Sequence, residues 1–253
     1  AAGALAGVQL HWVPGERGII TAEQVDAAIR PADPHSITTA LICLENTHNA
    51  GGGTIYPLST IEKIRAVAVK HGIPMHLDGA RLFNAVAATT LPPTAYAQHF
   101  ETVSLCLSKG LGAPVGSLLL SNDPKLIERA RRFRRMYGGA MRQAGVLAAA
   151  GIYALERHVA RLKTDHEHAK KLARLLQHIP SIQIAPQHVE TNIVFFDILD
   201  DGRSPNELVA ALKEQGVLIN SVGGKSYRAV THLDITEPQI EEAVAAFTRV
   251  LPR

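Results

Sequence analysis

Cysteine, aromatic residues and net charge are all scarce in this sequence. It has only two cysteines in 253 residues, Cys43 and Cys106, and both lie in apolar segments that predict buried strands. Such cysteines are typical of packed thiols rather than of a disulfide, so we expect a reducing, cytoplasmic location. With 26 basic and 23 acidic residues the formal net charge is +3, which gives no indication of a nucleic-acid partner.

Long apolar runs are missing as well. No segment reaches the length of a membrane span, and residues 1–12 lack the basic start and apolar stretch of a signal peptide. We therefore expect no membrane partner. The composition, 46% hydrophobic and 19% charged, is typical of a globular protein, and the length suits one large domain with a smaller one.

Strands and helices alternate in the prediction for the first half. Thr21 and Gln24 predict the start of a helix at residues 22–30, and a capping box at 59–62 with Gly72 delimits a second helix. Continuous apolar runs predict strands at residues 39–44, 73–77, 102–107 and 115–120. The last strand should be antiparallel, because the link before it is too short for a parallel crossover. This pattern predicts a mostly parallel α/β sheet.

Long helices and then a small α+β unit are predicted for the second half. Asp123 and Pro124 predict a helix to Tyr137, and a second helical stretch runs from about Met141 to Arg174. Short strands at 182–184, 192–196, 217–219 and 227–231 then alternate with helices at 204–215 and from 238 onward. We therefore expect a large α/β domain over residues 1–155 and a small α+β C-terminal domain over residues 156–253.

Asp78 and Lys109 follow the ends of two neighbouring predicted strands, and polar residues 45–49 follow the strand before them. Ligands of open α/β sheets bind outside the carboxyl ends of the strands, so these side chains should face one crevice. Pyridoxal 5'-phosphate (PLP) requires such a pair: a lysine that forms an imine with the cofactor aldehyde, and a carboxylate that keeps the ring nitrogen protonated. The small residues of segment 108–116 would allow close approach of the backbone to a ligand.

Five stretches of the sequence carry a family resemblance: residues 44–49, 76–85, 106–117, 138–145 and 230–234. In these stretches the chain resembles the L-threonine aldolases, PLP-dependent enzymes of fold type I in the beta-eliminating lyase group. The resemblance covers nearly the whole chain in family order and is most specific around Lys109. It implies an aspartate-aminotransferase-like fold and a lyase that cleaves the Cα–Cβ bond of L-threonine or L-allo-threonine to glycine and an aldehyde.

The resemblance also implies roles for individual residues. Lys109 would be the Schiff-base lysine and Asp78 the partner of the pyridinium nitrogen. Arg81 would lie near the phenolic oxygen of the cofactor and the substrate carboxylate. Arg228 would be the main clamp for that carboxylate, a task that suits a planar guanidinium.

Three further residues match family positions. Arg135 and Arg142 would approach the cofactor phosphate from a neighbouring subunit, so the resemblance implies a homodimer or homotetramer with shared active sites. His35 would lie near the substrate side chain, where a histidine can transfer protons at neutral pH.

The N-terminal part of the family pattern has no counterpart here. Family members begin with a Ser-Asp-Thr motif, a Gly-Thr phosphate loop and a histidine that stacks on the cofactor. This sequence starts without methionine, and residues 6–10 predict a turn that enters a strand. We therefore expect a large domain that is incomplete at its N-terminus.

Three alternatives stay open. The same fold could support another reaction, such as β-elimination or transamination. His48, His76 and Asp78 could instead form the metal site of a hydrolase. Finally, the chain could be an inactive, truncated member of the family.

Overall fold

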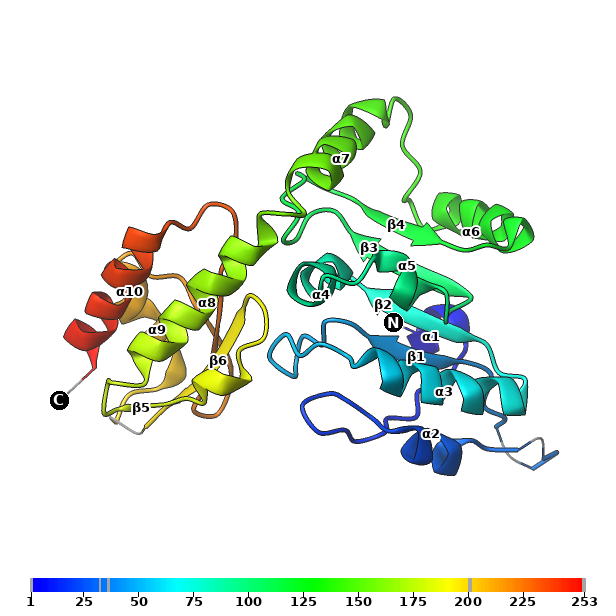
Figure 1. Ribbon diagram of the computed structural model, residues 1–253, viewed down its shortest axis with the longest axis horizontal. Coiled ribbons are helices and arrows are strands. Elements are labelled where there is room, and N and C mark those ends of the chain that lie inside the picture. Colours follow the sequence, from blue (N-terminus) through cyan, green and yellow to red (C-terminus); the bar gives the residue numbers. More distant parts are fainter. Residues whose placement is uncertain (1, 32, 36, 200–201, 252–253) are drawn as a thin grey trace.

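The computed structural model describes residues 2–31, 33–35, 37–199 and 202–251. Figure 1 shows two lobes, each built on its own sheet, with β1 to β4 in the larger lobe and β5 to β8 in the smaller one. The smaller lobe lies beyond the ends of β1, β2 and β3, so the two sheets do not stack on each other (Figure 1). None of the helices in the described part of the chain is long and apolar enough to cross a membrane.

The sheet of the larger lobe has the strand order β1-β2-β3-β4. Its strands are β1 (Ile42–Glu45), β2 (Met75–Gly79), β3 (Thr102–Cys106) and β4 (Ser117–Leu120). β1, β2 and β3 are parallel, whereas β4 is antiparallel to β3, which confirms the predicted reversed strand. The short link folds back tightly, since Leu107 donates its N–H to the carbonyl of Gly116 at 2.9 Å.

Four helices contribute to the core on one face of this sheet: α2 (Ala22–Ala28), α3 (Leu58–His71), α4 (Leu82–Thr89) and α5 (Pro93–Ala97). Alternate strand residues, including Leu44, Leu77 and Leu105, are buried against them. The residues between, such as Cys43 and Asp78, point to the other face and are exposed. The prediction of buried cysteines is therefore wrong for Cys43, because the core formed with α2 to α5 lies on the opposite face of the sheet. Cys106 is half-buried.

Helix starts were only partly predictable. The Thr21–Gln24 capping box of α2 is confirmed, with reciprocal hydrogen bonds of 2.8 and 3.3 Å. The capping box predicted at residues 59–62 is wrong, because the Pro57 carbonyl accepts the first helical bonds and Ser59 lies inside α3. Gly72 ends α3 as predicted, in the left-handed region with φ 66°.

The first residues form a short helix, α1 (Ala2–Ala6), followed by an irregular segment. The predicted strand at residues 6–10 is therefore wrong. Alanine is the strongest helix former, and residues 2–6 are mostly alanine. Figure 1 shows α1 behind the sheet, next to β1 and β2.

Three helices lead from the larger lobe to the smaller one: α6 (Pro124–Met136), α7 (Gly145–Arg157) and α8 (Leu162–Leu176). The predicted N-cap of α6 is confirmed, since Asp123 accepts a hydrogen bond from the Lys125 N–H at 2.9 Å. The expected continuous helix from Met141 to Arg174 is wrong. The helix is interrupted at residues 158–161, where the His158 ring lies 2.6 Å from the Leu111 carbonyl. No glycine or proline marks this position in the sequence.

The smaller lobe is the expected α+β unit. Its antiparallel sheet has the order β5-β6-β8-β7, and the 3-10 helix η1 (Pro186–His188) precedes β6. The strands are β5 (Ile182–Gln183), β6 (Ile193–Ile198), β7 (Asn220–Gly223) and β8 (Ser226–Val230). Helices α8, α9 (Pro205–Glu214) and α10 (Glu237–Val250) supply the rest of its core. The strand predicted at residues 217–219 is wrong, since β7 starts at Asn220. The predicted domain boundary between residues 155 and 156 falls inside α7 and stays a prediction.

Candidate active site

Charged side chains meet at the edge of the sheet where β1, β2 and β3 end. The strand register pairs Glu45 with Asp78, and Asp78 with Ser104. Lys109 follows β3 in a tight turn, in which its carbonyl accepts the Gly112 N–H at 2.8 Å. Asp78 and Lys109 are both exposed. The structure therefore brings these two residues to one edge of the sheet, facing the smaller lobe (Figure 1).

Arg81 is the second residue after β2 and occupies the N-cap position of α4. The chain turns there because Asp78 Oδ1 accepts the N–H of Ala80 at 3.0 Å. Burial lowers the pKa of Arg81; the negative charge of Glu45 opposes this effect, and the positive charge of Arg228 adds to it. The half-buried Arg81 guanidinium therefore lies between charges from both lobes.

Arg228 reaches this edge from β8 of the smaller lobe. Its NH1 group donates a hydrogen bond to Asn49 Oδ1 in the larger lobe at 3.1 Å. Its Nε atom is buried and has no partner among the described residues. A buried guanidinium N–H without an acceptor is costly, and an anionic ligand could supply that acceptor.

The end of β1 and the loop after it carry polar residues for which the sequence predicts no individual role. Glu45 Oε1 accepts the Asn49 N–H at 3.0 Å, and Asn46 donates its N–H to the Asp78 carbonyl at 2.9 Å. The Asn46 Nδ2 and Thr47 Oγ1 atoms are buried and lack partners within the described residues. The signal was present, because these polar residues directly follow an apolar strand. The sequence did not show which of them would face the ligand.

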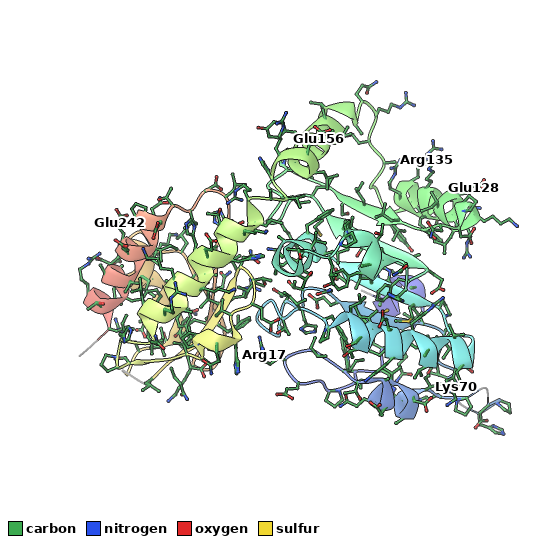
Figure 2. All side chains as sticks on the ribbon, in the orientation of Figure 1. Arg17, Lys70, Glu128, Arg135, Glu156 and Glu242 are labelled. Carbon is green, nitrogen blue, oxygen red and sulfur yellow. The ribbon has the colours of Figure 1, made fainter. Side chains whose placement is uncertain are left out.

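Three residues that the sequence assigned to the site are not brought to it. Figure 2 shows Arg135 on α6, at the side of the larger lobe that faces away from the smaller lobe. Arg142 is exposed in the turn before α7. His35 belongs to the link between α2 and β1, which Figure 1 shows at the opposite end of the sheet, where β1 begins. The roles of these three residues stay predictions.

The alternative metal site gains no support. His76 Nδ1 lies 2.7 Å from the Thr102 hydroxyl, and burial lowers the pKa of His76. His48 Nδ1 accepts the Gly51 N–H at 3.0 Å. Within the part of the chain that the structure describes, no group of three or more His, Cys, Asp or Glu side chains is arranged to hold a metal ion.

Sequence comparison decides the lineage of the chain. The family model of the beta-eliminating lyases matches residues 1–199. A probable low-specificity L-threonine aldolase from Arabidopsis thaliana is 39% identical over 250 residues, which are 97% of this chain and 70% of the relative. The low-specificity L-threonine aldolase of Escherichia coli K12 is also 39% identical, over 93% of this chain and 68% of its own length. The chain belongs to the threonine aldolases of the beta-eliminating lyase family.

Solved structures agree with this family fold. A putative L-allo-threonine aldolase from Listeria monocytogenes superposes with a TM-score of 0.79 at 18% identity, over 98% of this chain and 70% of the other. The threonine aldolase of Leishmania major gives a TM-score of 0.71 at 20% identity, over 94% and 69% of the two chains. The fold is therefore that of the PLP-dependent enzymes of fold type I, as predicted.

Enzymes of this family use PLP, and the residues at the edge of the sheet fit its ring and aldehyde. Lys109 provides an exposed amine and Asp78 an exposed carboxylate, at the ends of neighbouring parallel strands. The unpartnered Asn46 Nδ2, Thr47 Oγ1 and Arg228 Nε atoms are polar groups that a bound ligand could satisfy. The described residues thus fit the ring and the aldehyde group of the cofactor.

Proposed function

We propose that this protein is a PLP-dependent aldolase that cleaves L-threonine, L-allo-threonine and related β-hydroxy-α-amino acids to glycine and an aldehyde. One observation carries the proposal: Lys109 and Asp78 share one edge of the sheet, and Arg228 of the smaller lobe reaches the same edge through Asn49. The match to low-specificity L-threonine aldolases supports the choice of substrate.

The chemistry is divided between the cofactor and the chain. Bound PLP supplies an aldehyde that condenses with amines and a ring that accepts electron density from the substrate. Lys109 would supply the amine that binds the cofactor aldehyde. The Asp78 carboxylate would keep a proton on the ring nitrogen, which would make the ring a better electron acceptor.

Two arginines orient the substrate. The Arg228 guanidinium binds the substrate carboxylate, and Arg81 adds a second positive charge on the same side. Arg81 and Arg228 are close enough for the charge of Arg228 to lower the pKa of Arg81. A carboxylate between them would offset this repulsion, which favours a substrate that carries a carboxylate, as an α-amino acid does.

A second copy of the chain completes the active site in this proposal. Arg135 and Arg142 bind the cofactor phosphate from a neighbouring subunit, and His35 accepts or donates a proton near the substrate side chain. Support comes from the many exposed apolar side chains of β4, α6, α7 and the turn before α7. They are Leu118, Leu119, Leu120, Phe133, Met136, Tyr137, Met141, Val146, Ile152 and Tyr153. Large apolar side chains exposed in such number favour subunit contacts, and sedimentation should show a homodimer or homotetramer.

We also propose a cytoplasmic location. The two cysteines are free thiols, and β2 lies between the strands that carry them. Free thiols persist in a reducing compartment.

The function can be tested with one substitution and one matched control. Lys109→Ala should abolish the visible absorbance of protein-bound PLP and the release of acetaldehyde from threonine. Lys163→Ala, which removes an exposed lysine from α8, should leave both unchanged. The same absorbance band in Lys109→Ala and in the unmodified protein would rule out the assignment.

The products separate this function from its alternatives. Glycine and an aldehyde indicate an aldolase, pyruvate and ammonia a β-eliminating enzyme, and an exchanged amino group an aminotransferase. Absorbance from bound PLP without any of these products indicates an inactive family member. Each result can be read from one reaction mixture by amino-acid analysis and a coupled aldehyde assay.

A further inference from the structure

We propose that Asn49 is a positioning residue for Arg228, and that it sets the orientation in which this guanidinium receives the substrate carboxylate. The inference deepens the proposed function and rests on it. It assigns a role to a neutral amide that lies outside the strands, in the loop after β1. The role is indirect, because Asn49 acts through Arg228 and not on the reacting atoms.

The contact between Asn49 and Arg228 joins the two lobes. Arg228 NH1 lies 3.1 Å from Asn49 Oδ1, and the two residues are 179 positions apart in the sequence. Arg228 lies on β8, where its neighbours across the sheet are Phe195 on β6 and Asn220 on β7. Asn49 is therefore the larger lobe's anchor for a side chain that belongs to the smaller lobe.

Asn49 is itself held firmly in place. Its N–H donates to Glu45 Oε1 at 3.0 Å, and its carbonyl accepts the N–H of Gly52 at 3.1 Å. The same loop docks on the smaller lobe, since the Thr191 hydroxyl donates to the Gly53 carbonyl at 2.7 Å. These bonds fix the backbone of Asn49, so only its side-chain torsions remain to be ordered when Oδ1 holds the Arg228 guanidinium.

The neutral charge of Asn49 matters for the chemistry. A guanidinium has five N–H donors and one positive charge, and an amide oxygen occupies a single donor without neutralising that charge. Arg228 therefore keeps its charge and its NH2 group for a ligand, and its buried Nε still lacks a partner. An aspartate at position 49 would hold the same NH1 group, but it would compete electrostatically with the substrate carboxylate.

The first test needs no cofactor. In the ¹⁵N NMR spectrum, Arg228 should show separate signals for its two terminal nitrogens, because the bond to Asn49 slows rotation of the guanidinium. Arg228→Lys identifies these signals by their loss. Asn49→Ala should merge them, while Asn49→Asp should keep them apart. Asn220→Ala is the matched control, since it removes an exposed amide from the other neighbour of Arg228 and should change nothing.

The second test measures ligand binding by the PLP-loaded protein through the change in cofactor absorbance on addition of glycine. Asn49→Ala should raise the dissociation constant for glycine about tenfold, since Arg228 must then be ordered on binding. Asn49→Asp should also weaken glycine binding, although it keeps Arg228 ordered. The affinity for PLP should be unchanged in both variants. In an Arg228→Ala background, Asn49→Ala should change the constant less than about twofold.

The outcomes separate the two proposals. Unchanged Arg228 signals in Asn49→Ala, or an equal change in Asn220→Ala, would overturn the role of Asn49 whether or not the protein binds PLP. Additive effects of Asn49→Ala and Arg228→Ala on the free energy of glycine binding would also overturn the role of Asn49, because they would show that the two residues act independently. If Asn49→Ala does not fold, the Asn49→Asp result decides: tight glycine binding with ordered Arg228 would contradict the proposal. Failure of Lys109→Ala to remove the cofactor absorbance would overturn only the proposed function.

Discussion

Asn84 of α4 donates a hydrogen bond to His166 of α8 across the junction of the two lobes, with 3.1 Å between Nδ2 and Nε2. The same amide nitrogen lies 3.3 Å from Oδ1 of Asn192, just before β6. All three side chains are buried, with 2%, 4% and 3% of their surface exposed. Because Nε2 of His166 accepts this bond, the imidazole must be neutral. Burial, with a smaller effect from Lys170, lowers the pKa of His166 to about 4.

The lowered pKa of His166 makes the stability of the fold depend on pH. In the unfolded chain His166 binds a proton near pH 6.5, whereas in the folded protein it does so only near pH 4. Between these values the unfolded state binds more protons, so the free energy of unfolding should fall as the pH falls. The contribution of this group is on the order of 3 kcal/mol over the whole window.

Urea denaturation at pH 7, 5.5 and 4.5 would measure this effect. His166→Gln should flatten the decrease, because its amide does not titrate. His178→Gln is the control, since His178 is exposed. If His166→Gln and the unmodified protein lose stability in parallel, His166 is not the titrating group.

Removal of the amide of Asn84 should be costly. Asn84→Ala leaves buried atoms of His166 and Asn192 without a partner, and we expect a loss of about 2–4 kcal/mol in the free energy of unfolding. Asn206→Ala, at an exposed position of α9, should change it by less than about 0.5 kcal/mol. Equal effects of the two substitutions would show that the junction does not depend on this amide.

The difference between Asn84 and Asp78 shows what the sequence could reveal. Asp78 lies at the carboxyl end of an apolar strand, and the carboxyl ends of parallel strands lie at one edge of a sheet. Its place at the same edge as Lys109 could therefore be predicted. Asn84 lies within a helix of small residues, and its partner His166 is 82 positions away. Contacts of this kind depend on how two lobes pack, for which a local pattern carries no signal.

The same limit applies to the outer parts of the site. The family resemblance predicts a role for Arg228 but none for its partner Asn49, because the bond between them spans two lobes. The sequence does not predict the break between α7 and α8, because no glycine or proline lies there, and the contact that His158 makes with Leu111 leaves no local signal. Apolar periodicity thus predicted most strands and helices, whereas packing between distant segments decided the rest.

Two adjacent glycines in the loop after β1 offer a matched comparison. Gly52 and Gly53 both have positive φ angles, 88° and 75°, so alanine is strained at either position. A Cβ on Gly53 would lie 2.3 Å from the buried Thr191 hydroxyl, whereas one on Gly52 would meet only the Phe195 ring at 3.6 Å. Gly53→Ala should therefore also displace Thr191, which holds this loop on the smaller lobe.

Thermal or urea denaturation would compare the two variants. We expect a cost of about 1 kcal/mol for Gly52→Ala, from backbone strain alone. Gly53→Ala should cost about 1–3 kcal/mol more, because the Thr191 hydrogen bond is lost. Equal costs would mean that Thr191 can move without loss.

Asp165 and Lys171 of α8 both form ion pairs, which differ in burial and should differ in their effect on stability. Asp165 is fully buried and is held by both terminal nitrogens of Arg161, with 3.2 Å between NH1 and Oδ2. Lys171, in contrast, contacts Glu237 and Glu241, whose side chains are 64% exposed. Arg161→Met should cost about 3–5 kcal/mol at neutral pH, since it leaves a buried carboxylate without a partner. Lys171→Met should have little effect on the free energy of unfolding, because water and salt screen an exposed ion pair.

The pH dependence of Arg161→Met identifies the cause of its instability. Burial raises the pKa of Asp165, and the hydrogen bonds and charge of Arg161 oppose this effect, so the pKa should rise further in the variant. The folded variant then holds a proton on Asp165 at pH values where the unfolded chain has lost it. Its deficit in unfolding free energy relative to the unmodified protein should therefore shrink as the pH falls toward 4. His166 titrates in both proteins, so its contribution cancels when the two unfolding free energies are compared. A deficit that does not change with pH would instead indicate lost packing around the aliphatic part of the Arg161 side chain.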